Sequence, residues 1–185
     1  MAKFARLSLP LDTPPMEAKL ADTIPEGQGW QFEPKWDGFR CLAFRDGDEL
    51  ELMSKSGKPL ARYFPEIAEA LLALAERRFI LDGELILPVG DVVSFAALQL
   101  RLHPAASRIE KLACETPAQL MLFDCLQEGP DNLTHAPLSA RRAALERFMT
   151  KAAGERLLLS PFTSGCRDAE QWLAASGGAL DGIVA

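Results

Sequence analysis

Lys35 lies in the stretch of this sequence that concentrates the most reactive side chains, residues 32–40 (FEPKWDGFR). The stretch places an amine, two carboxylates and a guanidinium within nine residues, with apolar residues on both sides. A lysine amine becomes a nucleophile when neighbouring cations or desolvation remove its proton. Further charges can then stabilise the product of its attack. The alternative is a salt-bridged lysine in a charged turn, because clustered charges are often structural.

Strands on either side of this stretch would display Lys35 at the end of a sheet. Apolar residues alternate before it and again over residues 39–44, which is typical of strands. Pro34 has no N–H and suits a strand edge or end. Asp37-Gly38 is a strong turn dipeptide. We therefore expect Lys35 to sit where one strand leaves a sheet and another enters it.

A second pair of carboxylates belongs to a strand predicted over Phe79–Leu87. Asp82 and Glu84 share one face of this apolar strand, because successive side chains of a strand point to opposite faces. Buried carboxylates need cationic partners or a metal. Arg77 and Arg78 could pair with them but precede the strand, so the two carboxylates favour a ligand site.

The remaining pattern predicts an α+β fold, with antiparallel sheets flanked by helices. Residues 1–27 predict an irregular, proline-containing lead-in packed on the domain, with at most a short helix near Met16–Ala21. Phe123, in an apolar strand over Gln119–Leu126, belongs by position to the core. The helix over Leu138–Met149 carries an outer basic face of Arg141, Arg142 and Arg147, which by pattern is solvated. Further elements are expected as strands over Trp30–Lys35, Arg40–Arg45, Glu49–Met53 and Arg156–Ser160, and as helices over Pro65–Ala75, Ser94–Arg101, Ala105–Ala113 and Asp168–Ala175, the last closing at Gly177-Gly178.

Length and composition limit the class of protein. With 185 residues, 48% of them hydrophobic, the chain predicts one soluble globular domain, or one domain with an incomplete second. No window approaches a membrane span and no secretory signal is visible. Four scattered cysteines and two histidines argue against a zinc site and favour a reducing cytoplasm. The net charge of −6 excludes a surface that binds nucleic acid over its whole extent, but allows a local basic patch.

Five motifs in order make the sequence resemble the adenylation domain of ATP-dependent DNA ligases, within the lysine nucleotidyltransferase superfamily. Residues 35–40 (KWDGFR) match the family's K-x-D-G-x-R nucleophile motif, and residues 82–85 (DGEL) match its D-G-E-hydrophobic motif. Residues 54–57 (SKSG), alone a plain surface turn, resemble its S-R-x-G motif, with Lys55 in place of arginine. Residues 122–124 (LFD) resemble the aromatic motif beneath the base. Residues 181–184 (DGIV) resemble the start of E-G-hydrophobic-hydrophobic-x-K, with Asp181 in place of glutamate.

The resemblance is greatest to small bacterial ligases of the end-joining type. It implies a nucleotidyltransferase (ATP-grasp-like ligase adenylation) fold over residues 28–185. Lys35 would attack the α-phosphate of ATP, expel pyrophosphate and hold AMP as a lysyl-AMP intermediate. AMP would then pass to a DNA 5′-phosphate for nick or end joining.

The resemblance also assigns roles to individual residues. Glu33 would contact the adenine edge, and Phe123 would stack on the base. Arg40 would hold ribose or phosphate beside Lys55, and Glu84 would bind the ribose hydroxyl or the metal. The full nucleotide-binding set is Glu33, Pro34, Lys35, Trp36, Arg40, Lys55, Glu84 and Phe123. Mg²⁺ or Mn²⁺ would be held by Asp37, Glu84 and Asp181.

The family's later K-x-K motif and its C-terminal OB-fold domain are absent from this sequence. We therefore expect a C-terminally incomplete domain that binds nicked or broken duplex DNA weakly and cannot seal nicks alone. Its expected partners are the missing OB-fold domain and end-joining proteins, with no membrane, in the bacterial cytoplasm. Three alternatives stay open: an RNA ligase or GTP-using capping-type nucleotidyltransferase, a catalytically idle nucleotide-binding fragment, and a generic α+β domain with an ion-paired turn.

Overall fold

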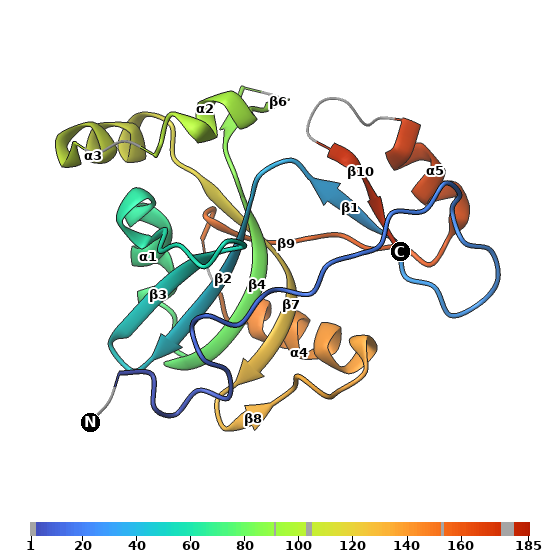
Figure 1. Cartoon of the computed structure of the whole chain (residues 1–185), viewed down its shortest axis with the longest axis horizontal. Helices are drawn as coiled ribbons and strands as arrows, with labels where there is room; N and C mark the ends of the chain where they lie inside the picture. Colours follow the sequence, from blue (N-terminus) through green and yellow to red (C-terminus); the bar gives the residue numbers. More distant parts are fainter. Residues whose placement is uncertain (1–2, 91, 103–104, 153, 175–179) are drawn as a thin grey trace.

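A six-stranded sheet forms the centre of the chain in the computed structural model, which describes residues 3–90, 92–102, 105–152, 154–174 and 180–185 (Figure 1). Its path runs β3 (Glu49–Ser54), β2 (Phe39–Asp46), β4 (Arg78–Ile86), β7 (Gln119–Glu128) and β8 (Asp131–Asn132), while β9 (Leu157–Leu159) also pairs with β7. Every pair along the path is antiparallel, as predicted. The exception is β9, which runs parallel to β7.

Helices cover one face of this sheet. They are α1 (Pro65–Leu72), preceded by the 3₁₀ turn Ala61–Tyr63, α2 (Phe95–Gln99), α3 (Ala106–Glu115) and α4 (Leu138–Thr150). Ile67 of α1, Leu98 of α2 and Leu145 of α4 enter one core cluster with the sheet residues Ala43 and Leu81. The helix-side residues of β2 and β4 alternate along each strand, because successive side chains of a strand point to opposite faces.

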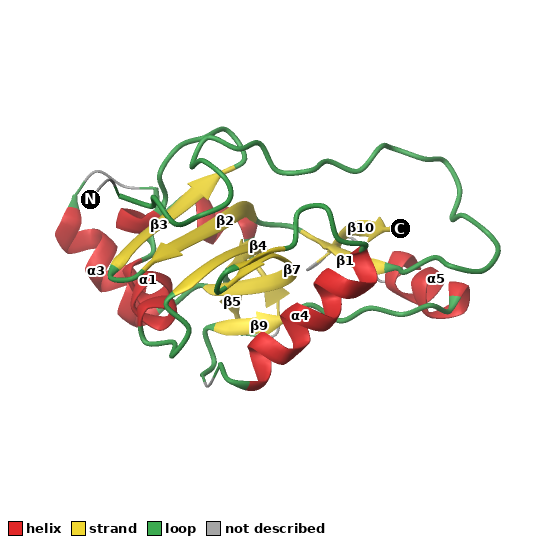
Figure 2. Ribbon diagram, turned by 90° about the horizontal axis from the view of Figure 1, so that it is seen from below, coloured by secondary structure: helices red, strands yellow, loops and turns green. Residues whose placement is uncertain are grey.

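The N-terminal lead-in covers the opposite face (Figure 2). Phe4, Leu7, Leu9 and Leu11 pack against a second cluster formed by the other side chains of the sheet, Leu42, Phe44, Met53 and Ile80. The lead-in continues to the far end of the molecule, where the Pro25 carbonyl accepts a contact from Cys166 Sγ at 4.0 Å. The central sheet is therefore buried on both faces.

The short helix predicted near Met16–Ala21 does not form, and these residues have no regular secondary structure. Six residues preceded by two prolines are too few for a stable isolated helix, and helices of this length need tertiary packing. Such packing is lacking here: the side chains of Met16 and Leu20 are 72% and 99% exposed.

A smaller sheet lies beside one end of the central sheet (Figure 1). It pairs β1 (Glu33–Trp36) with β10 (Leu180–Val184) in antiparallel fashion, and α5 (Cys166–Ala174) packs on it. The strand predicted from Trp30 begins later, since only Phe32 forms a bridge before β1, to Thr163.

Several boundaries differ from those predicted. Helix α1 ends at Leu72 rather than Ala75, and α2 at Gln99 rather than Arg101. The two-stranded hairpin of β5 (Pro88–Val89) and β6 (Val92–Val93) had no predicted counterpart. The predicted closure at Gly177-Gly178 lies outside the described residues. Within the described ranges, no helix is both long and apolar enough to cross a bilayer.

Candidate active site

Lys35 projects from β1 with half of its side chain exposed and its Nζ ion-paired to Asp181 Oδ2 of β10. The two residues are far apart in the sequence, and the antiparallel pairing of Pro34 with Ile183 brings them together. The amine is therefore accessible to a ligand and already has a carboxylate partner.

Gly38 sets how closely the turn after β1 approaches the central sheet. A Cβ at this position would lie 2.1 Å from the Leu85 carbonyl oxygen and 2.9 Å from Glu84 Cγ, both of β4. Only glycine allows such an approach. The turn that follows Lys35 is thereby fixed against Glu84, and the charges of Lys35 and Asp37 both act on that carboxyl group.

Glu84 is the most strongly perturbed carboxyl group of the site. Burial raises its pKa to about 7, and Asp82 and Asp37 contribute in the same direction, while Arg40 and Lys35 oppose the rise. These four neighbours all belong to the motifs that the sequence reading selected. Perturbed carboxyl groups of this kind cluster at functional sites.

Arg40 bridges Asp82 and Phe123. Its Nε and Nη2 donate to Asp82 Oδ1 and Oδ2 at 2.6 and 2.7 Å, and its Cζ lies 4.5 Å from the Phe123 ring centroid. Asp82, only 3% exposed, is therefore paired with Arg40 rather than with Arg77 or Arg78. Since Arg40 covers one face of the half-buried ring, a base stacking on Phe123 must use the other face or displace the guanidinium.

Two residues outside the predicted set of site residues, Asp124 and Arg141, support this arrangement. Asp124 of β7 lies directly opposite Asp82 and accepts from Arg141 Nε at 2.8 and 3.0 Å. The prediction that Arg141 and Arg142 lie on a solvated face is wrong, because they are 8% and 5% exposed. Charged residues are buried when they are paired, and a helical pattern alone does not reveal a partner on a distant strand.

The remaining predicted residues of β1 are anchored to other segments. Glu33 accepts from Gln31 Nε2 at 2.6 Å, and burial raises the pKa of its carboxyl group. Trp36 Nε1 donates to Ser160 Oγ at 2.9 Å, just after β9. Pro34 is buried in the strand. These contacts hold β1 in place on both sides of Lys35.

Lys55, in the exposed loop after β3, pairs with Glu17 of the lead-in at 2.8 Å. The neighbouring Met16 carbonyl accepts from Arg40 Nη2 at 3.4 Å. The lead-in thus links Lys55 to the Arg40 side of the site.

The structure does not gather Asp37, Glu84 and Asp181 into one metal-binding group. Among the described residues, no set of three or more His, Cys, Asp or Glu side chains could hold a metal ion, and Asp181 is occupied by Lys35. The described residues therefore do not hold these three carboxylates together as one site, and their metal-binding role stays a prediction.

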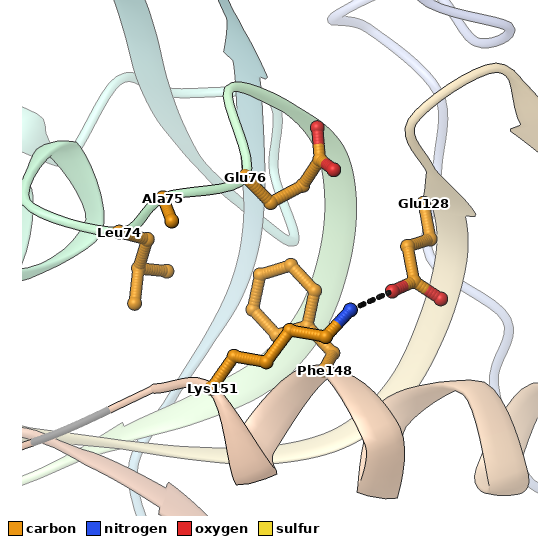
Figure 3. A pocket seen from close by; sticks show the side chains of 6 residues that line it. All are labelled: Leu74, Ala75, Glu76, Glu128, Phe148 and Lys151. Carbon is orange, nitrogen blue, oxygen red and sulfur yellow. Dashed lines mark ion pairs between the residues drawn. The ribbon is translucent and has the colours of Figure 1, made fainter.

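Two hollows elsewhere do not include the predicted residues. The first has a volume of about 10 Å³, which is room for roughly one water molecule. It lies beside Phe148, where Lys151, at the C-terminal end of α4, forms an ion pair with Glu128 (Figure 3). The second, about 340 Å³, lies between α1 and α3 and is lined by Arg62, Pro65, Ala106, Ile109 and Glu110, none of them a nucleophile.

Known proteins resemble this chain over nearly its whole length. The family model for the ATP dependent DNA ligase domain matches residues 15–185. DNA ligase C2 of Mycolicibacterium smegmatis is 46% identical over 182 residues, which cover 97% of this chain and 51% of that protein. DNA ligase C of Mycobacterium tuberculosis is 42% identical over 185 residues, with the same coverage.

Solved structures agree with this assignment. A mycobacterial DNA ligase D complexed with ATP and MES superposes with a TM-score of 0.57 at 25% identity, over 83% of this chain and 46% of that one. The ligase domain of M. tuberculosis LigD gives the same TM-score and identity over 47% of its chain. The chain spans about half the length of the curated relatives it matches. Its matched motifs, fold and relatives together place it in the family of ATP-dependent DNA ligase domains.

Proposed function

We propose that this chain supplies the nucleotidyl-transfer step of an ATP-dependent DNA ligase, with Lys35 as the nucleophile. The observation that carries the proposal is the convergence of Lys35, Glu84, Arg40 and Phe123 from four strands of two sheets. The relatives named above are DNA ligases, which favours this reading over the GTP-using and idle alternatives.

In the proposed reaction, Lys35 first gives up a proton within its ion pair with Asp181 and then leaves this pair to attack. Asp181 is the carboxylate already placed at Nζ, so it is suited to orient the amine and to accept that proton. A nitrogen–phosphorus bond then forms between Nζ and the α-phosphorus of ATP, and the bond to pyrophosphate breaks. A DNA 5′-phosphate oxygen next attacks the same phosphorus and releases Lys35 as the amine. In a whole ligase, attack by a 3′-hydroxyl would then seal the strand and release AMP, a step that we do not assign to this chain alone.

The other residues position the nucleotide around this amine. We assign Glu33 and Phe123 to the base, Arg40 and Lys55 to ribose and phosphate, and Glu84 to a ribose hydroxyl or the metal. Phosphoryl transfer depends mainly on positioning and on cations near the phosphates. Pro34 and Trp36 act indirectly: Pro34 is buried in β1, and the Trp36 side chain anchors β1 to Ser160.

Mg²⁺ or Mn²⁺ would reach the site on the phosphates of ATP and offset their charge. Mg²⁺ commonly binds through one or two carboxylates together with substrate phosphates. Asp37 and Glu84, which are electrostatically coupled, are the carboxylates this proposal assigns to it. Duplex DNA with a nick or break is the proposed second substrate.

Incubation with ATP followed by intact-mass measurement tests the proposal. We expect one AMP attached to Lys35 through an acid-labile bond, and none with GTP. Lys35→Arg is the matched variant, because it can keep the ion pair to Asp181 but should form no adduct. Transfer of the AMP to a 5′-phosphorylated nick in DNA, and not to a nicked RNA duplex, is the expected second step. A folded protein that acquires no AMP, or acquires it at another residue, would contradict the proposal.

A further inference from the structure

Residues 14–21 of the lead-in, here called the N-terminal strap, contact two of the cations assigned to the nucleotide. Glu17 Oε2 lies 2.8 Å from Lys55 Nζ, and the Met16 carbonyl accepts from Arg40 Nη2 at 3.4 Å. The family match begins at Pro15, so the strap lies almost wholly inside the matched region. Figure 2 shows the lead-in on the face of the sheet opposite α4.

The strap is weakly held compared with the packed residues that precede it. Residues 16–23 are all exposed and lack regular secondary structure, whereas Leu7, Leu9 and Leu11 before them pack on the sheet. In the ion pair itself, the Lys55 and Glu17 side chains are 59% and 63% exposed. Segments with few buried contacts open at low cost, so the strap can move while the packed lead-in stays in place.

The two cations that the strap contacts have different kinds of carboxylate partner. Arg40 is paired with Asp82, which is buried and belongs to the sheet. Lys55 is instead paired with Glu17, an exposed carboxylate from another segment. The Glu17 carboxylate weakens the positive field of Lys55 and takes one of the hydrogen-bond donors that Lys55 could offer to an incoming phosphate.

We propose that the N-terminal strap is a displaceable stand-in for the nucleotide's phosphates. In the free protein, Glu17 forms an ion pair with Lys55. When ATP binds, its more highly charged phosphates take the place of the Glu17 carboxylate. This inference rests on the proposed role of Lys55 in nucleotide binding. Since the Met16 carbonyl also accepts from Arg40 Nη2, displacement of the strap frees one N–H of that nitrogen, while its bond to Asp82 remains.

The test is binding of α,β-methylene-ATP, which cannot transfer its AMP, measured by calorimetry at low salt. Glu17→Gln removes the competing charge and should tighten binding about 1.5- to 5-fold, the range expected for an exposed ion pair. The gain should shrink in roughly 1 M salt, where the screening length falls to about 3 Å. Glu26→Gln is the matched control: it makes the same charge change in an exposed residue of the same lead-in and should leave binding unchanged.

A double variant shows whether the effect acts through Lys55. In a Lys55→Met background, Glu17→Gln should give no gain, because there is no cation left to release. Equal affinities for Glu17→Gln and Glu26→Gln, or weaker binding by Glu17→Gln, would overturn the strap while leaving AMP attachment to Lys35 intact. Loss of both nucleotide binding and AMP attachment in the unmodified protein would instead remove the proposed function, and the strap with it.

Discussion

Replacing Glu84 by glutamine should stabilise the fold at alkaline pH even though it removes a group assigned to the nucleotide. Burial raises the pKa of Glu84 to about 7 in the folded chain, against an ordinary value of 4.5. Between these two values the unfolded chain binds fewer protons than the folded one. The free energy of unfolding therefore falls as pH rises through this window and levels off above pH 7.

The size of the effect follows from the gap between the two pKa values, which corresponds to about 3 kcal/mol once Glu84 is fully ionised. Glutamine resembles the protonated acid and does not titrate. The stability difference between Glu84→Gln and the unmodified protein should therefore be below about 0.5 kcal/mol near pH 4.5 and grow to about 1–3 kcal/mol at pH 8. The lower end applies if solvent and the nearby cations screen the carboxylate effectively.

Urea unfolding of both proteins at a series of pH values measures this difference. Glu69→Gln, at an exposed position of α1, serves as the control and should show no comparable trend. A Glu84→Gln difference that is the same at pH 4.5 and pH 8, or a Glu84 carboxyl resonance that titrates near 4.5, would refute the reasoning. The same variant should bind ATP more weakly, since the stabilised site lacks its carboxylate.

Three further substitutions probe how the site is built. Gly38→Ala places a methyl group 2.1 Å from a β4 carbonyl oxygen, so AMP attachment should fall at least tenfold and the melting temperature should drop; unchanged values of both would contradict the close approach. Asp82→Asn leaves Arg40 without its buried carboxylate, and urea unfolding should show a loss of about 2–4 kcal/mol; a loss below about 0.5 kcal/mol would mean that the pair is not buried as described. Trp36→Phe removes the hydrogen bond to Ser160 and should cost about 1 kcal/mol; matched stability in Trp36→Phe and Ser160→Ala, with no further loss in the double variant, is the expected sign that both act through this bond.

The sequence alone determined the elements whose side chains alternate clearly. In β2 and β4 every second side chain points to the same face, so periodicity predicted both strands and which residues share a face, and these faces enter two separate core clusters. The Asp37-Gly38 dipeptide also predicted the turn that follows Lys35. The order of the motifs indicated the ligase family, which the comparisons then showed. These are short-range patterns, and neighbouring residues are sufficient to produce them.

Only the tertiary structure decided which charged side chains form ion pairs with one another. Asp181 lies 146 residues from its partner Lys35, and Arg141 is buried because a carboxylate on β7 faces it. A residue's periodicity says which face it occupies, but its partner depends on strand register and helix packing across the whole chain. This dependence on the rest of the fold also explains why Met16–Ala21 forms no helix. Its sequence allowed a short helix, but no core surface was left to stabilise one, and the segment lies across the site instead.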